Sequence, residues 1–156
     1  MSLHLNAPDT LHDIHAVVDT LYRFAAGIDL RDRKLLSSAF TEDAISDFRP
    51  AGAKAGFEYP VLQGRESIVE ALSTSLSGLD TSHSFSNPRV MVDGDTARVD
   101  VLVEAQHVSS VNGARQYLMK NRYDVVLVRR DTGWEIRHVI VDNVWRTGDR
   151  SVLTGI

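Results

Sequence analysis

The feature that most constrains this chain is a change of hydrophobic period near Thr81. Before it, apolar residues recur every three or four positions, and after it they alternate with polar residues almost to the end of the chain. A period of two indicates half-buried strands, because successive side chains of a strand point to opposite faces of a sheet. Helices followed by a run of strands predict an α+β fold.

Three helices are expected before the change of period. The first begins with a cap at Asp9 or Thr10 and ends at the motif IDLRD, residues 28–32. The second and third are expected at residues 32–40 and 65–78. Each has one apolar face, so the three helices can cover one side of a curved sheet.

Between the second and third helices, residues 44–48 alternate like a short strand. Residues 49–64 follow, with two prolines, three glycines and no hydrophobic period, and they are interpreted as a mobile loop. A loop of this length in a compact domain is usually functional or disordered.

The second half of the chain is predicted to be a meander of about four antiparallel strands. Turn sequences divide it at DGD (93–95), NGAR (112–115) and DTG (131–133). A sheet that curls over helices leaves an apolar pocket between them, where small-molecule sites are usually found.

Composition excludes several classes of function. The 156 residues are expected to form one domain, 1–156, and no internal repeat divides them. A net charge of −4 without a run of lysine and arginine argues against a nucleic-acid partner. No segment resembles a membrane span or a secretory signal, so no membrane partner is expected and the cytoplasm is the expected location. The absence of cysteine excludes thiolate chemistry and disulfides.

Asp29 is the residue that first suggests chemistry. It lies at the edge of the apolar face in the last turn of the first helix, where an anion opposes the helix dipole. His83 and His107 are each placed on the apolar face of a predicted strand. A carboxylate that accepts from one ring nitrogen can hold a histidine ready to take a proton through the other nitrogen.

Structural interpretations stay open beside this one. Either histidine can be a hydrogen-bonded core residue, and Asp29 can be a helix-end residue paired with Arg31 or Arg33. Asp29, His83 and His107 also have the ligand types of a two-histidine, one-carboxylate iron site, although they lack a motif spacing. No metal or other cofactor is predicted.

The chain resembles the SnoaL-like branch of the NTF2-like superfamily. The resemblance runs from about residue 10 to 148 and rests on IDLRD, TSHSFSN, VDGDTARV, RRDTGWEI and VWRTG in this order. It implies an α+β cone whose strongly curved, mainly antiparallel sheet encloses an apolar pocket, usually in a homo-oligomer such as a dimer or trimer. Members include scytalone dehydratase, hexachlorocyclohexane dehydrochlorinase, polyketide cyclases and ketosteroid isomerase.

The resemblance also implies site residues. The Asp–His pair shared by the dehydratase and the dehydrochlorinase falls on Asp29 and His83, and the second histidine of the dehydratase falls on His107. Its two tyrosines, which polarise the substrate carbonyl through water, fall on Ile28 and Phe48, and neither of these side chains can do so. Further substrate-binding residues are expected among Phe24, Ile28, Phe48, Phe57, Tyr59, Leu72, Val103, Arg146 and either Tyr123 or Asp124, according to strand register.

Two functions are compatible with this site. The first is a cofactor-independent lyase or isomerase for a small, hydrophobic, cyclic molecule, with His83 as the base, Asp29 orienting it, and His107 donating to the departing oxygen or holding a water. The second is a ligand-binding or scaffold protein, for example one like the small subunit of a ring-hydroxylating dioxygenase, in which the Asp–His pair is structural.

Overall fold

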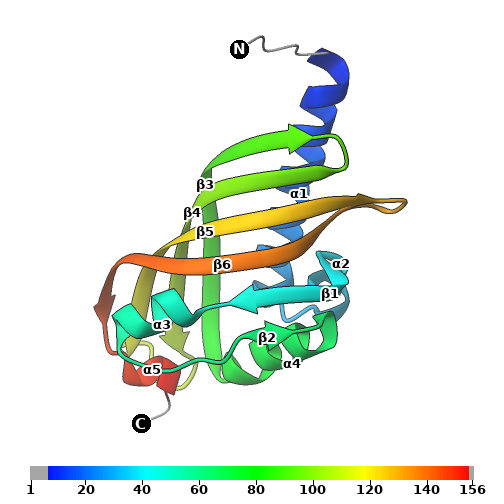
Figure 1. Ribbon diagram of the computed structural model, residues 1–156. Coiled ribbons are helices and arrows are strands. Elements are labelled where there is room, and N and C mark those ends of the chain that lie inside the picture. Colours follow the sequence, from blue (N-terminus) through cyan, green and yellow to red (C-terminus); the bar gives the residue numbers. More distant parts are fainter. Residues whose placement is uncertain (1–6, 155–156) are drawn as a thin grey trace.

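The computed structural model describes residues 7–154, and the predicted ends of the 1–156 domain lie outside this range. Its helices are α1 (Ala7–Asp29), α2 (Arg33–Ser38), α3 (Arg49–Ala55), α4 (Arg65–Ser75) and α5 (Ser151–Thr154). Its strands are β1 (Phe40–Asp47), β2 (Leu62–Gln63), β3 (Leu79–Asp93), β4 (Thr96–Ser109), β5 (Gln116–Arg130) and β6 (Gly133–Gly148). Figure 1 shows this arrangement.

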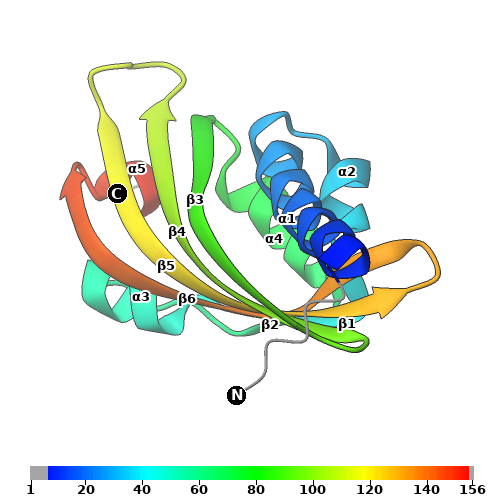
Figure 2. The same ribbon diagram turned by 90° about the horizontal axis from the view of Figure 1, so that it is seen from above.

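The six strands form one sheet in the order β2-β1-β6-β5-β4-β3. Neighbouring strands are antiparallel except for β1 and β6, which run parallel. Figure 2 shows that the sheet is strongly curved and that α1 and α4 lie on its concave side. The α+β prediction, with helices against a curved, mainly antiparallel sheet, is confirmed, and all three predicted turns separate the expected strands.

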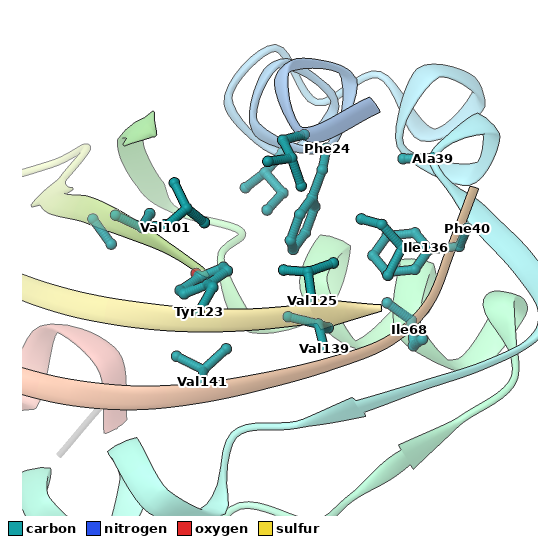
Figure 3. Packing of buried hydrophobic residues seen from close by; sticks show 14 of the residues in the cluster. Phe24, Ala39, Phe40, Ile68, Val101, Tyr123, Val125, Ile136, Val139 and Val141 are labelled. Carbon is teal, nitrogen blue, oxygen red and sulfur yellow. The ribbon is translucent and has the colours of Figure 1, made fainter. Parts of the chain in front are cut away.

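The core lies between the concave face of the sheet and α1. Leu21 and Phe24 of α1 pack against inward residues of the strands, including Val99, Val125 and Val139, which are fully buried. Figure 3 shows how Phe24 extends from α1 toward the sheet. Alternate residues of β4, β5 and β6 are buried, so the period of two in the sequence reports a sheet with one packed face.

The structure corrects several predicted boundaries. The helix α1 begins at Ala7, so Asp9 and Thr10 lie within it rather than capping it. Asp32 does cap α2, because its carboxylate accepts from the backbone N–H of Leu35 at 2.9 Å. However, α2 ends at Ser38, and Phe40 begins β1 instead of ending the helix. The strand is therefore longer than predicted.

The interpretation of residues 49–64 as a loop is wrong for its first half, which forms α3. Pro50 lies in the first turn of this helix, where a missing N–H does no harm. The small residues Ala51, Gly52 and Ala55 are buried, and α3 packs against β6. Gly56 ends the helix at a φ of 85°, in the left-handed conformation that glycine adopts readily.

Candidate active site

A cavity of about 260 Å³ lies between the concave face of the sheet, α1, α4, α5 and the segment after α3. Its wall is mostly apolar, with polar groups from the strands and a few more from α4, α5 and the segment after α3. The lining residues are Phe24, Ile28, Ser46, Phe48, Phe57, Glu58, Tyr59, Leu62, Leu72, Ser75, Leu76, His83, Ala105, His107, Met119, Asn121, Tyr123, Val141, Leu153 and Thr154. An apolar cavity with few polar groups is the usual form of a small-molecule site.

Asp29 and His83 are in contact at this cavity. His83 Nδ1 lies 2.7 Å from Asp29 Oδ1, and the backbone N–H of His83 donates to Asp29 Oδ2 at 2.7 Å. The hydroxyl of Thr81 also donates to Asp29 Oδ1, at 3.0 Å. Because β3 supplies three donors to the carboxylate, the unfavourable helix dipole at Asp29 is offset.

The chain turns sharply just after Asp29, which aims the carboxylate at β3. Arg31 is left-handed with a φ of 56°, and its backbone N–H bonds to the carbonyl of Ile28. Its guanidinium donates to the carbonyl groups of Ile28, Leu76 and Leu79, while Arg33 pairs with Glu70. The alternative in which Asp29 pairs with Arg31 or Arg33 is therefore wrong.

The environment of Asp29 favours its ionised form. Burial by itself raises the pKa of the carboxyl, but the hydrogen bonds from the His83 ring and backbone and from Thr81 outweigh it, so the pKa lies below its usual value. The carboxylate fixes the ring of His83 with Nδ1–H as the donor. Nε2 is then the acceptor of the neutral ring, and it makes no hydrogen bond to any residue in 10–154.

His107 stands close to His83, with ring centroids 6.0 Å apart and the rings nearly perpendicular. Its Nδ1 lies 3.0 Å from the carbonyl oxygen of Tyr117, so Nδ1 carries the proton and Nε2 is an acceptor. The pKa of His107 is lowered to about 4, chiefly by burial; the hydrogen bond to the Tyr117 carbonyl opposes this shift and the nearby His83 adds to it. At neutral pH the His107 ring therefore offers the cavity an unprotonated nitrogen.

Two hydrogen-bond donors face the cavity from β5. The ring of Tyr123 packs edge-on against Phe85, with centroids 5.4 Å apart, and contacts Phe24. Burial raises the pKa of Tyr123, so its hydroxyl stays protonated. Asn121, two residues earlier on the same face, is 1% exposed and accepts from Asn143 Nδ2 at 2.9 Å. Within the described part of the chain, neither the Tyr123 hydroxyl nor the Asn121 amide nitrogen has a hydrogen-bond partner.

Most of the predicted binding residues lie at the cavity, among them Phe24, Ile28, Phe48, Phe57, Tyr59, Leu72 and Tyr123. Val103 does not; it is fully buried in the core between Phe85 and Asn121. Asp124 lies on the opposite face of the sheet, where it pairs with Arg98. Since alternate residues share a face, the register that places Tyr123 inward must place Asp124 outward.

The prediction of Arg146 as a lining residue is also wrong. A register shift between β5 and β6 pairs Lys120 with Trp145 but Asn121 with Asn143, so β6 has one extra residue here. Asn143 thereby faces inward, and Arg146 is exposed. The Arg146 guanidinium instead donates to Asn143 Oδ1 at 3.2 Å.

Several lining residues were missed by the sequence-based prediction. Asn121 and Met119 have a recoverable signal, because they precede Tyr123 by two and four residues and therefore share its face. Leu153 and Thr154 have none, since nothing in the sequence predicts that α5 reaches the cavity.

The three residues considered for an iron site are not arranged as one. Among residues 10–154, no three histidine or carboxylate side chains are grouped so that they could hold a metal ion. Asp29 instead uses both oxygens for bonds to β3. In the described range no helix is long and apolar enough to cross a membrane.

A curved sheet that closes with α1 and α4 around an apolar cavity defines the NTF2-like class of α+β folds. Residues 9–140 match the SnoaL-like domain family, and the chain belongs to this family. A curated relative, terrestric acid biosynthesis cluster protein E of Penicillium crustosum, is 27% identical over 158 residues, covering 97% of this chain and 96% of the relative.

Solved structures share the fold at lower identity. Kfla4162 of Kribbella flavida has a TM-score of 0.84 at 21% identity, covering 94% of this chain and 99% of its own. A candidate scytalone dehydratase of Novosphingobium aromaticivorans has a TM-score of 0.74 at 19% identity, covering 90% and 89%. Hexachlorocyclohexane dehydrochlorinase LinA-type3 of Novosphingobium barchaimii has a TM-score of 0.74 at 18% identity, covering 90% and 92%.

Proposed function

We propose that this protein is a cofactor-independent lyase or isomerase that removes a proton from a small, hydrophobic, cyclic molecule. The observation that carries this proposal is the 2.7 Å contact between His83 Nδ1 and Asp29 Oδ1 at the wall of a mostly apolar cavity. The similarity to a candidate scytalone dehydratase and to a dehydrochlorinase supports the same reaction class.

In the proposed reaction His83 Nε2 takes a proton from a carbon atom of the substrate. Asp29 stabilises the resulting imidazolium through the Nδ1–H bond, and Thr81 and the backbone of β3 hold the carboxylate in place. The imidazolium then returns the proton, either to another carbon in an isomerisation or to a leaving group in an elimination. Because the abstracted proton is returned within the same reaction, no other reactant is needed.

The sequence left two roles open for His107, donating to the departing oxygen or holding a water, and its hydrogen bonding favours the second. Its Nδ1–H is used by the Tyr117 carbonyl, and its Nε2 is unprotonated at neutral pH. His107 is therefore proposed as an acceptor that holds a substrate hydroxyl or a water molecule, and not as the acid that protonates the departing oxygen.

The test is turnover by the variants His83→Ala and Asp29→Asn on hydroxylated and halogenated cyclic compounds, followed by mass spectrometry. Each change is expected to lower the rate by about 10²- to 10⁴-fold, the usual contribution of general acid–base catalysis. His15→Ala, an exposed histidine on α1, is the control and should keep the full rate. Full activity of His83→Ala would remove this mechanism.

A scaffold or ligand-binding role is the second candidate. The observation that favours it is the bond from the His83 backbone to Asp29, because this bond ties α1 to β3 whether or not chemistry occurs. If the pair is only structural, Asp29→Asn should lower the free energy of unfolding by about 1–3 kcal/mol. No compound in the screen would then be turned over by the unaltered protein.

A further inference from the structure

Arg31, in the turn after α1, has a backbone conformation that is unusual for its residue type. Its φ is 56°, in the left-handed region where the Cβ atom is crowded and glycine or asparagine is favoured. Asn87 is the other non-glycine residue of the described range with a positive φ, and asparagine tolerates this conformation. An arginine at such a position indicates that its side chain has a role that glycine could not fill.

The guanidinium of Arg31 binds carbonyl groups at the ends of three elements. Nη1 donates to the carbonyl of Ile28 in the last turn of α1, and Nη2 donates to that of Leu76 at the end of α4, each at 2.9 Å. Nη2 also donates to the carbonyl of Leu79, the first residue of β3. The last carbonyl groups of a helix lack a partner within the helix, and a cation also meets the negative end of its dipole. One side chain therefore holds the ends of α1 and α4 against the start of β3.

Two of these elements carry the Asp–His pair. Asp29 is the last residue of α1, and His83 lies on β3. The three bonds from β3 to the Asp29 carboxylate require the end of α1 and the start of β3 to keep their relative position. Arg31 Nη1 also lies 3.5 Å from Thr81 Oγ1. Because a guanidinium can only donate, this contact leaves the one hydroxyl proton of Thr81 for Asp29.

Arg31 is close to the site without forming part of the cavity wall. It is not among the lining residues, and within residues 10–154 it makes no ion pair with Asp29, so the carboxylate accepts from β3 alone. Burial is the main cause of the lowered pKa of His107, and the charge of Arg31 adds to it, which places this charge near the polar end of the cavity. Any effect of Arg31 on a reaction must therefore pass through other residues.

We propose that Arg31 is a positioning residue of the Asp29–His83 pair, because its guanidinium holds the end of α1 against β3 so that the carboxylate meets His83 Nδ1. Without these bonds the end of α1 moves relative to β3, and the Nδ1–H of His83 loses its fixed acceptor. This inference rests on the proposed function, because the pair that Arg31 positions is the proposed base and its partner. The positioning itself can be measured without a substrate.

Arg31→Gly is the variant that isolates the side chain, because glycine adopts the positive φ of this turn without strain. The measurement is nuclear magnetic resonance of the unliganded protein with ¹⁵N-labelled histidine. The proton on His83 Nδ1 should give a far-downfield signal, identified by its loss in His83→Ala. In Arg31→Gly this proton should exchange with water at least about tenfold faster. Thermal melting, recorded in parallel, reports whether the variant is folded.

A purely structural role predicts a different result. Arg31→Gly would then lower the melting temperature and leave the exchange of the His83 proton unchanged, which would overturn the proposal. Arg31→Lys is the second variant, and it keeps the test open if Arg31→Gly does not fold. An ammonium is a point donor and cannot serve carbonyl groups on three elements as a guanidinium fork does, so the exchange rate in Arg31→Lys should also rise. An unchanged rate there would equally overturn the proposal.

Arg33→Ala is the matched control. It removes a guanidinium only two residues away, which pairs with Glu70 of α4 at 2.6 Å and has no hydrogen bond to β3 within residues 10–154. The signal of the His83 proton should be unchanged in this variant. The same loss of signal in Arg33→Ala would show that any weakening of this region frees the proton, and the specific role of Arg31 would be wrong.

Chemical rescue tests the guanidinium itself. Arg31 is exposed, so a small ion can reach the space that Arg31→Gly leaves open. Ethylguanidinium at tens of millimolar should slow the exchange of the His83 proton again, whereas ethylammonium, which has the same charge, should do so much less. Equal restoration by both ions, or none by ethylguanidinium, would contradict the assignment to the bonds of the guanidinium fork.

Turnover distinguishes failure of this inference from failure of the proposed function. On any compound that the unaltered protein converts, Arg31→Gly should lower kcat by about 10- to 100-fold and change KM by less than about twofold, since Arg31 does not line the cavity. If turnover depends on His83 but neither kcat nor the His83 signal depends on Arg31, the inference alone is wrong. If the signal depends on Arg31 but His83→Ala keeps full turnover, the proposed function alone is wrong.

Discussion

Polar side chains are paired on the outer face of β5 and carry unpaired donors on its inner face. On the outer face Lys120, Arg122 and Asp124 each pair with an oppositely charged residue of β4, at N–O distances of 3.5, 2.9 and 3.0 Å. On the inner face Asn121 and Tyr123 carry donors without a hydrogen-bond partner in the described range. Figure 3 shows Tyr123 on this face, near Phe24 and Val141.

The difference separates surface chemistry from a binding site. The two side chains of an exposed ion pair satisfy each other's charge but contribute little to stability, because water already solvates both charges. The donors of Asn121 and Tyr123 face the cavity instead, where water or a ligand that enters it can pair with them. A polar side chain placed one residue further along β5 therefore belongs to the cavity instead of the surface, and its expected role changes accordingly.

The largest expected effect comes from placing a carboxylate on the inner face of β5 rather than on its outer face. Val125 is fully buried on the inner face, so Val125→Asp should lower the free energy of unfolding by more than about 4 kcal/mol or prevent folding. Val126→Asp is the control, because residue 126 faces outward and pairs across the strands with Arg98. Urea denaturation followed by circular dichroism measures both. Similar stability of the two variants would erase the distinction between the faces.

A smaller effect is expected from the pH dependence of His107. Its pKa is about 4 in the folded protein and near 6.5 in the unfolded chain. Between these two pH values the unfolded chain binds a proton that the folded protein does not bind. The stability is therefore complete above about pH 6.5 and falls as the pH drops toward 4, by up to about 3 kcal/mol. Urea denaturation of the unaltered protein and of His107→Phe should differ in slope over this window. Parallel curves would contradict the assignment.

The smallest effect is expected on the outer face. Asp124→Asn removes one charge of an exposed pair and should change the free energy of unfolding by less than about 1 kcal/mol, measured by urea denaturation. A loss as large as that of Val125→Asp would mean that the two faces of the strand do not differ in this way.

The fold was largely predictable because its main signals are periodic. The change of period at Thr81 and the turns DGD, NGAR and DTG correspond to real boundaries between β3, β4, β5 and β6. The helix α3 was not predictable from its composition, because it forms where small residues let it pack against β6. Tertiary contact there overrides the low helix propensity of glycine and proline.

The sequence predicted which face of the sheet the site residues occupy, but not the strand register that selects between neighbouring residues. Alternation placed His83 and His107 inward, and the structure brings both to the cavity with Asp29. The choice between Tyr123 and Asp124 depended on strand register, which a period of two cannot specify. Arg146 was misplaced because the extra residue near Asn143 interrupts the alternation of β6, and no residue type marks it.

The parallel pairing of β1 with β6 sets the order in which this protein can be completed during synthesis. Phe40 pairs with Ile136 and Asp47 with Ile140, so β1 cannot form this pairing until β6 has been synthesised. Pairings between distant segments form slowly, because a long loop must close first. Ser46 and Phe48, which border the cavity from this side, are therefore held in place only once β6 has been synthesised, so the cavity cannot be completed before the sheet is.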